Sequence, residues 1–167
     1  MQDDNADRLV VLDEIDARVA LDDPEALSAQ ETASYDVAIV GGGPAGLVAA
    51  GHCRMRGLSS ITFEAQAFGG QLVSLYPSKP VTNFPAHLDV ASGELARRLA
   101  EQAAHFGAEL REHEPVESVA FARDMGFALR SSGRRVKARA VLLALGLAVS
   151  GRASWGSKTR LASPATV

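Results

Sequence analysis

The stretch Asp36–Gly46, DVAIVGGGPAG, joins a short apolar run to a cluster of glycines and decides how this chain folds. The apolar residues before the glycines are typical of a buried parallel strand. The small residues that follow, from Leu47 to about Arg56, predict a helix that Gly57 ends. The stretch therefore predicts a strand, a tight turn and a helix in immediate succession.

Three glycines of this turn have separate expected roles. Gly41 permits the sharp turn out of the strand, Gly43 leaves room for a pyrophosphate beside the backbone, and Gly46 allows close packing of the helix. Pro44 is tolerated because the first helical turn, which includes Ala45, has N–H groups without helical partners. Those N–H groups and the helix dipole favour bound phosphates.

An acidic residue stands where a dinucleotide site requires one. Ser60–Phe63 predicts a second strand, and Glu64 follows at its tip, 18 residues after Gly46. A carboxylate there can accept hydrogen bonds from an adenosine ribose, which suits FAD or NAD and disfavours the 2′-phosphate of NADP. This order of elements indicates dinucleotide binding rather than a purely structural βαβ unit.

The residues after the acid carry a family resemblance. The GGGPAG turn, Glu64, the GGQL segment Gly69–Leu72 and a YPxK stretch from Tyr76 together resemble the FAD domain of the thioredoxin-reductase-like flavoproteins. The branch most similar is the thioredoxin-reductase-type ferredoxin/flavodoxin–NADP⁺ reductases, although the NFP at 83–85 is similar to the thioredoxin reductases proper. The resemblance covers about 115 residues, from Tyr35 to about Ala148.

The resemblance implies cofactor contacts for further residues. Gly70 would let backbone lie against a flat flavin ring, and Gln71 would bond to flavin carbonyls or ribityl hydroxyls. Tyr76 would stack or hydrogen-bond there, or merely anchor the loop beside the following proline. Val116 would present its backbone to the adenine, and Ala144–Gly146 would pass near the pyrophosphate. The flavin carries the chemistry, so no catalytic side chain is expected.

The sequence from Ser92 onward predicts a helix, a third strand, a β-meander and a final strand. Ser92 is a candidate N-cap for a helix that runs to Phe106, and Ala108–Arg111 predicts a third strand. Three short segments, Val116–Phe121, Phe127–Arg130 and Arg135–Ala138, predict a β-meander, and a separate buried strand follows over 140–144. The fold class expected is α/β, a three-layer Rossmann-like FAD-binding domain whose parallel sheet has a meander crossover, and it is incomplete.

Charge marks the expected domain boundaries. Residues 1–34 hold ten acidic and two basic side chains, a local charge of −8, and are interpreted as an acidic extension. The rest of the chain holds ten acidic and fifteen basic residues, a charge of +5. Residues 35–148 form the expected FAD/NAD(P)-binding domain, and 149–167 show neither helical nor strand periodicity and are expected to be an irregular tail.

The composition of the chain limits the protein classes, partners and cellular compartments that are expected for it. The chain has 167 residues, of which 47% are hydrophobic and 22% charged, as in ordinary globular proteins. A net charge of −3 argues against a nucleic-acid partner, and the longest apolar runs are too short for a membrane span. The single cysteine, Cys53, excludes an internal disulfide and favours the cytoplasm. The four histidines have no metal-ligand spacing, so no metal is expected.

The resemblance implies a function for this chain, and two alternative functions remain open. The chain is expected to be the FAD-binding portion of an NAD(P)H-dependent oxidoreductase that passes electrons to ferredoxin, flavodoxin or thioredoxin, and a homodimer is left open. Because family members are about twice as long and contain an NADPH domain, NADPH binding is expected only in a complete member, and this chain is expected to be truncated. The alternatives are a non-catalytic flavin-binding remnant and a plain NAD-binding dehydrogenase domain. In the latter, Tyr76 and Lys79 would have the wrong spacing for a short-chain dehydrogenase pair.

Overall fold

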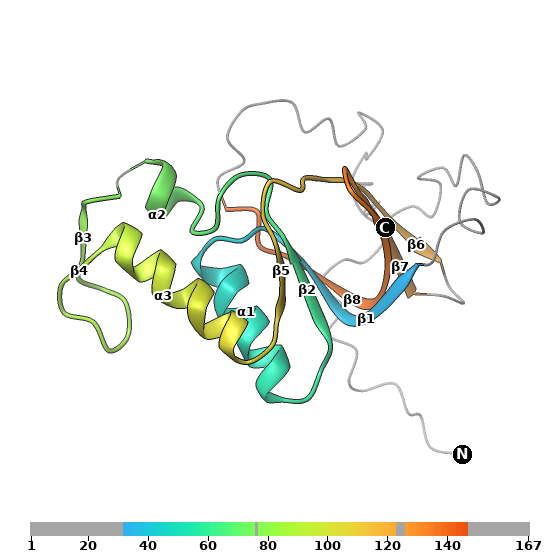
Figure 1. Ribbon diagram of the computed structural model, residues 1–167, viewed down its shortest axis with the longest axis horizontal. Coiled ribbons are helices and arrows are strands. Elements are labelled where there is room, and N and C mark those ends of the chain that lie inside the picture. The colour runs from blue at the N-terminus through green and yellow to red at the C-terminus, as the bar shows by residue number, and fades with distance from the viewer. Residues whose placement is uncertain (1–31, 76, 123–125, 147–167) are drawn as a thin grey trace, which may run out of the picture.

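A six-stranded sheet organises the part of the chain that the computed structural model describes, residues 32–75, 77–122 and 126–146. Its strands lie in the order β5-β2-β1-β8-β7-β6 (Figure 1). Their bounds are β1 Ala33–Val40, β2 Ser60–Phe63, β5 Glu109–Arg111, β6 Val116–Ala122, β7 Gly126–Ser131 and β8 Arg135–Leu143. The strands β5, β2, β1 and β8 run parallel, whereas β6, β7 and β8 form an antiparallel meander.

Two helices cover one face of the parallel strands. Helix α1 spans Pro44–Met55 and helix α3 spans Ser92–His105, and they pack beside each other. Ile39 of β1 meets Ala50 of α1 and Ala103 of α3 in a core cluster. The small alanines allow both helices to approach the sheet closely, which places the start of α1 directly against the ends of the strands.

Helix α3 begins differently from the expectation. Ala91 is the N-cap, and Ser92 is already helical, so the prediction of Ser92 as N-cap is wrong. The Ser92 hydroxyl instead donates to the carbonyl oxygen of Lys79 at 2.6 Å. This bond ties α3 to a small lobe that the sequence did not predict. The lobe consists of α2 (Gln71–Ser74) and the short hairpin β3 (Pro80–Val81) and β4 (Val90–Ala91).

The meander forms the third layer on the opposite face. Ile61 and Phe63 of β2 contact a core cluster that includes Leu129 of β7 and Val136 of β8. Successive residues of a strand point to opposite faces, so the central strands can contribute side chains both to the core under the helices and to the core under the meander. The layers are therefore helices, parallel strands and meander, and the predicted Rossmann-like fold class is confirmed.

Two expectations for the last strand are wrong. The segments predicted over Arg135–Ala138 and 140–144 form one continuous strand, because β8 leaves the meander and continues along β1 without a break. The later part is not buried in the described chain, since Leu142 and Leu143 are 41% and 43% exposed. Only β1 pairs with this part of β8 among the described strands, so an apolar run alone did not secure its burial.

Candidate functional site

The glycine turn lies where the carboxyl ends of β1, β2 and β8 meet. The Gly41 amide donates to the carbonyl oxygen of Phe63 at 2.8 Å, and the Ala144 amide donates to that of Val40 at 2.8 Å. Gly41 has φ +110°, and a Cβ there would lie 2.3 Å from the carbonyl oxygen of Ala144. Gly46 is equally constrained, because its Cβ would lie 1.9 Å from the Gly41 carbonyl oxygen. The turn admits only glycine at these two positions.

The start of α1 faces open space. Gly43 is the N-cap, Pro44 is the first helical residue, and the Leu47 amide donates to the Gly43 carbonyl at 3.0 Å. No atom lies within 4 Å of where a Gly43 Cβ would be, in contrast to the crowded Gly41 and Gly46. The first amides of a helix have no partner within it and carry the positive end of its dipole. This opening can receive an anionic group against the backbone.

Glu64 is held beside this opening by backbone hydrogen bonds. Its carboxylate accepts from the Gly42 amide at 2.8 Å and from the Gln66 amide at 2.9 Å. Each carboxylate oxygen has further acceptor capacity, so Glu64 can also accept from ligand hydroxyls. The bond to Gly42 links the tip of β2 directly to the glycine turn, and it fixes the carboxylate within reach of a ligand that lies there.

The GGQL segment folds back over the glycine turn. The Gly69 amide donates to the Gly42 carbonyl at 2.8 Å, and a Cβ on Gly70 would lie 3.2 Å from the Cα of Gly43. The side-chain nitrogen of Gln71 would lie 3.2 Å from a Cβ placed on Gly146. Residues from three distant parts of the sequence therefore converge at one edge of the sheet.

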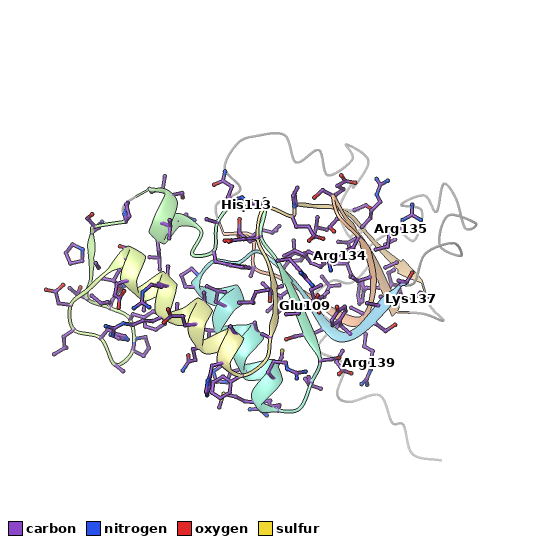
Figure 2. All side chains as sticks on the ribbon, viewed as in Figure 1. Glu109, His113, Arg134, Arg135, Lys137 and Arg139 are labelled. Carbon is purple, nitrogen blue, oxygen red and sulfur yellow. The ribbon has the colours of Figure 1, made fainter. Side chains whose placement is uncertain are left out.

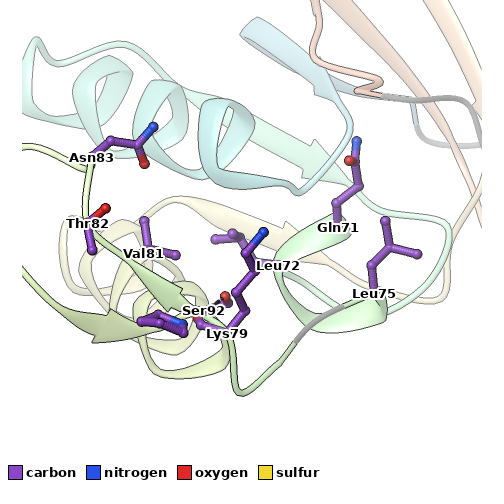
Figure 3. A pocket seen from close by; sticks show the side chains of 9 residues that line it. Gln71, Leu72, Leu75, Lys79, Val81, Thr82, Asn83 and Ser92 are labelled. Atoms are coloured by element: carbon purple, nitrogen blue, oxygen red, sulfur yellow. Dashed lines mark hydrogen bonds between the residues drawn. The ribbon is translucent and has the colours of Figure 1, made fainter.

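A cavity of about 490 Å³ continues from this convergence into the small lobe (Figure 3). Gln71, Leu72 and Leu75 of the α2 region line one side, and Thr82 and Asn83 lie opposite. Its walls mix aliphatic carbon with amide and hydroxyl groups and include the side chain of Lys79. Gln71 lines the cavity and also lies beside Gly146, at the edge of the sheet that carries the glycine turn Gly41–Gly46 and is here called the glycine edge, so the cavity adjoins the glycine edge at this residue.

A network of charged groups anchors the meander next to the tip of β2. The Glu114 amide donates to the Glu64 carbonyl oxygen at 2.9 Å, and the Glu114 carboxylate accepts from Ser131 and from Arg134. Burial alone would raise the pKa of Glu114, but these hydrogen bonds lower it below its ordinary value. Figure 2 shows Arg134 turned inward toward Glu109. The network holds the meander in place beside the site.

Tyr35 extends this network to β1. Its hydroxyl donates to Glu109 at 2.7 Å, and desolvation together with that bond raises the pKa of Tyr35 to about 12. Burial opposes ionisation of Glu109, yet the hydrogen bonds from Tyr35 and Arg111 lower the pKa of this carboxyl. These shifts are those of a structural network, and the network lies on the meander side of the sheet.

The structure brings most of the predicted site residues together. Gly41, Gly43, Gly46, Glu64, Gly70, Gln71, Ala144 and Gly146 lie at the one edge described above, with Pro44 and Ala45 in the first turn of α1. Val116 starts β6, two residues beyond the contact between Glu114 and Glu64. Tyr76 lies outside the described residues. The sequence reasoning did not predict that Thr82 and Asn83 line the cavity, although the quoted NFP stretch begins at Asn83.

Other candidate groups do not form a site in the described part of the chain. No group of three or more histidine, cysteine, aspartate or glutamate side chains there is placed to hold a metal ion. Cys53 is half-buried in α1, and desolvation raises the pKa of its thiol, which disfavours the reactive thiolate. None of the described helices is long and apolar enough to cross a membrane.

The fold and the glycine edge define a Rossmann-like dinucleotide-binding domain. Comparison with protein families makes the assignment specific, because residues 35–157 match the model of the pyridine nucleotide-disulphide oxidoreductases. The chain belongs to this family.

Individual relatives agree with the assignment. The chain is 37% identical over 115 residues to ferredoxin–NADP reductase 2 of Sulfolobus acidocaldarius, which covers 68% of this chain and 35% of that protein. It is 39% identical over 123 residues to the bifunctional thioredoxin reductase/thioredoxin of Mycobacterium leprae, covering 73% and 26%. The chain thus spans between a quarter and about a third of the length of these relatives.

Solved structures show the same likeness. The thioredoxin reductase of T. acidophilum superposes with a TM-score of 0.59 at 28% identity, covering 66% of this chain and 34% of that one. A ferredoxin-flavin thioredoxin reductase from Clostridium acetobutylicum gives a TM-score of 0.60 at 28% identity, covering 71% and 40%. The similarity again covers between a third and two fifths of each of these proteins.

Proposed function

We propose that this chain is the FAD-binding portion of an NAD(P)H-dependent flavoprotein oxidoreductase. The observation that carries the proposal is the junction at Gln71, where the glycine edge and the cavity meet. A dinucleotide needs an anion site between two sites for rings and sugars. The start of α1 provides the anion site, Glu64 accepts a hydrogen bond from the adjacent Gly42, and the cavity begins at Gln71.

The residues present fit FAD. The empty space beside Gly43 admits a pyrophosphate, and Glu64 can accept hydrogen bonds from the adenosine ribose. Gly70 lies against Gly43 without a side chain, and Gln71 offers both a donor and an acceptor to the flavin end. Ala144 and Gly146 would border the pyrophosphate, Val116 the adenine, and Tyr76 remains a proposed contact of the flavin end.

The protein contributes binding and orientation. FAD, when bound, accepts a hydride and releases electrons singly or in pairs. This chain's own backbone amides would hold the phosphates, and the aliphatic wall of the cavity would exclude water from the ring. No side chain of the site is required to act as an acid or base. NADPH and the hydride transfer itself belong to the complete protein.

The partner is proposed from the relatives. Their names include ferredoxin and thioredoxin, so the complete protein would pass electrons to a small redox protein of this kind. A single cysteine suits a reducing, cytoplasmic setting.

A plain NAD-binding domain is the competing function, because Glu64 would suit the ribose of either dinucleotide. Fluorescence titrations of the full chain with FAD, FMN and NADH separate the two, and we expect FAD to bind tightest. Glu64→Gln should weaken FAD about tenfold or more through loss of the charged acceptor. The matched variant Glu117→Gln, which removes the same charge from β6, should leave FAD affinity unchanged. Equal affinity for FMN, or preference for NADH, would contradict the proposal.

A further inference from the structure

The loop that carries Glu64 is bound along one side by the turn 112–115 between β5 and β6. The Glu114 amide donates to the Glu64 carbonyl oxygen at 2.9 Å. The preceding amide, of His113, donates to the Gln66 carbonyl oxygen, also at 2.9 Å. His113 has φ +56°, a left-handed conformation that can turn successive N–H groups toward the same side of the chain. The backbone around Glu64 is therefore fixed by this turn.

The side chain of Glu114 fixes the same turn from the meander. Glu114 is 9% exposed, and its carboxylate accepts from the Ser131 hydroxyl and from the Arg134 guanidinium, the latter at 2.8 Å. A Cβ on Gly133 would lie 3.2 Å from a Glu114 carboxylate oxygen, so the tip of the β7–β8 hairpin closes directly over this group. Glu114 thus contacts the hairpin through its side chain and the loop of Glu64 through its backbone amide.

The carboxylate of Glu64 takes its direction from two amides. It accepts from Gly42 at 2.8 Å and from Gln66 at 2.9 Å. Gln66 belongs to the loop whose carbonyl oxygens the turn 112–115 binds, whereas Gly42 belongs to the glycine turn. A displacement of the turn 112–115 would therefore move the backbone of Glu64 and one of its two donors relative to the other donor.

We propose that Glu114 is a positioning residue, which holds the Glu64 carboxylate in place for the adenosine ribose of a bound dinucleotide. This role rests on the proposed function, because it assigns the same task to Glu64. Burial alone would raise the pKa of Glu114, but the hydrogen bonds from Ser131 and Arg134 lower it below its ordinary value, so the group is ionised at neutral pH and its bonds are charge-assisted. The β7–β8 hairpin would then contribute to nucleotide affinity from outside the site.

Amide hydrogen exchange of the full chain without ligand tests the link directly. In Glu114→Gln, exchange of the Gly42 amide, which bonds to the Glu64 carboxylate, should rise about threefold or more. The Gly41 amide of the same turn, which bonds to the backbone of β2, should be unchanged. The matched variant Glu117→Gln removes the same charge from β6 and should leave both amides unchanged. An equal rise at Gly41 and Gly42 would show a general loosening of the domain and would overturn the proposal.

A double-mutant cycle on FAD binding gives a second measurement. Glu114→Gln should weaken FAD about threefold or more in the natural chain, but by less than about 1.5-fold in the Glu64→Gln chain, because the group that it positions is already altered there. Ser131→Ala removes the hydroxyl donor to Glu114 without a change of charge, and it should act in the same direction. This variant keeps the test available if Glu114→Gln does not fold.

The two measurements separate this role from the proposed function. Unchanged exchange at Gly42, or an undiminished loss of FAD affinity when Glu114→Gln is added to Glu64→Gln, would overturn the positioning role and leave the proposed function intact. If Glu64→Gln alone left FAD affinity unchanged, the ribose contact assigned to Glu64 would be wrong, and the proposed function would be contradicted together with this role.

Discussion

In the first half of β8, Arg135–Ala138, the strand lies between β7 and β1, and Val136 is 1% exposed. In the second half, β1 is the only described partner, and Leu142 is 41% exposed. The alternating, charged half is the buried one, and the uniformly apolar half is the exposed one. Burial along β8 therefore follows the presence of packed neighbours around the strand and not hydrophobicity alone.

The largest expected effect comes from placing the same charge in each half. Val136→Asp buries an unpaired carboxylate in the meander core and should lower the free energy of unfolding by more than about 4 kcal/mol. Leu142→Asp should change it by less than about 0.5 kcal/mol, because the side chain reaches water. Urea unfolding followed by circular dichroism measures both. Equal losses would show that the second half of β8 is covered after all.

A medium effect concerns association of the chain with itself. Exposed apolar residues on an unpaired strand edge favour edge-to-edge contacts. Leu142→Lys with Leu143→Lys should weaken self-association about tenfold or more, through lost apolar contact and added charge. Light scattering across a concentration series measures this, with Leu88→Lys as a control at an exposed leucine between β3 and β4. A similar response in the control would assign the effect to net charge.

The smallest effect concerns the ion network at the start of β8. Because the folded-state pKa values of Glu109 and Glu114 lie below their ordinary values, the unfolded chain binds more protons in acid. The contribution of the network is complete above the unfolded-state pKa near 4.3 and is lost as the pH falls through the lowered values. Glu114→Gln should reduce the loss of unfolding free energy between pH 6 and pH 3 by about 1 kcal/mol. Unfolding measured from pH 6 to pH 3 tests it, and unchanged pH dependence would contradict the role of Glu114.

Part of the glycine edge could be predicted from short stretches of sequence. The positive φ of Gly41 and the close approach of Gly46 to the Gly41 carbonyl arise within the turn itself, whereas the close approach of Ala144 to Gly41 depends on β8. Strand β2 was predicted with its observed bounds, because Ser60 is followed by three apolar or β-branched residues. The cavity was not predicted, since its walls come from α2, β3 and α3, and their packing is a long-range property.

Residue types at short spacing were enough to predict the strand-turn-helix at Asp36–Gly46, the acid at Glu64 and the division of the chain into an acidic and a basic part. Long-range packing, in contrast, brings Gln71 beside Gly146, joins the Ser92 hydroxyl to the backbone at Lys79, and makes β8 continuous with its second half exposed. The physical reason is that burial and convergence depend on which distant strands and helices become neighbours, and local sequence periodicity does not specify that choice.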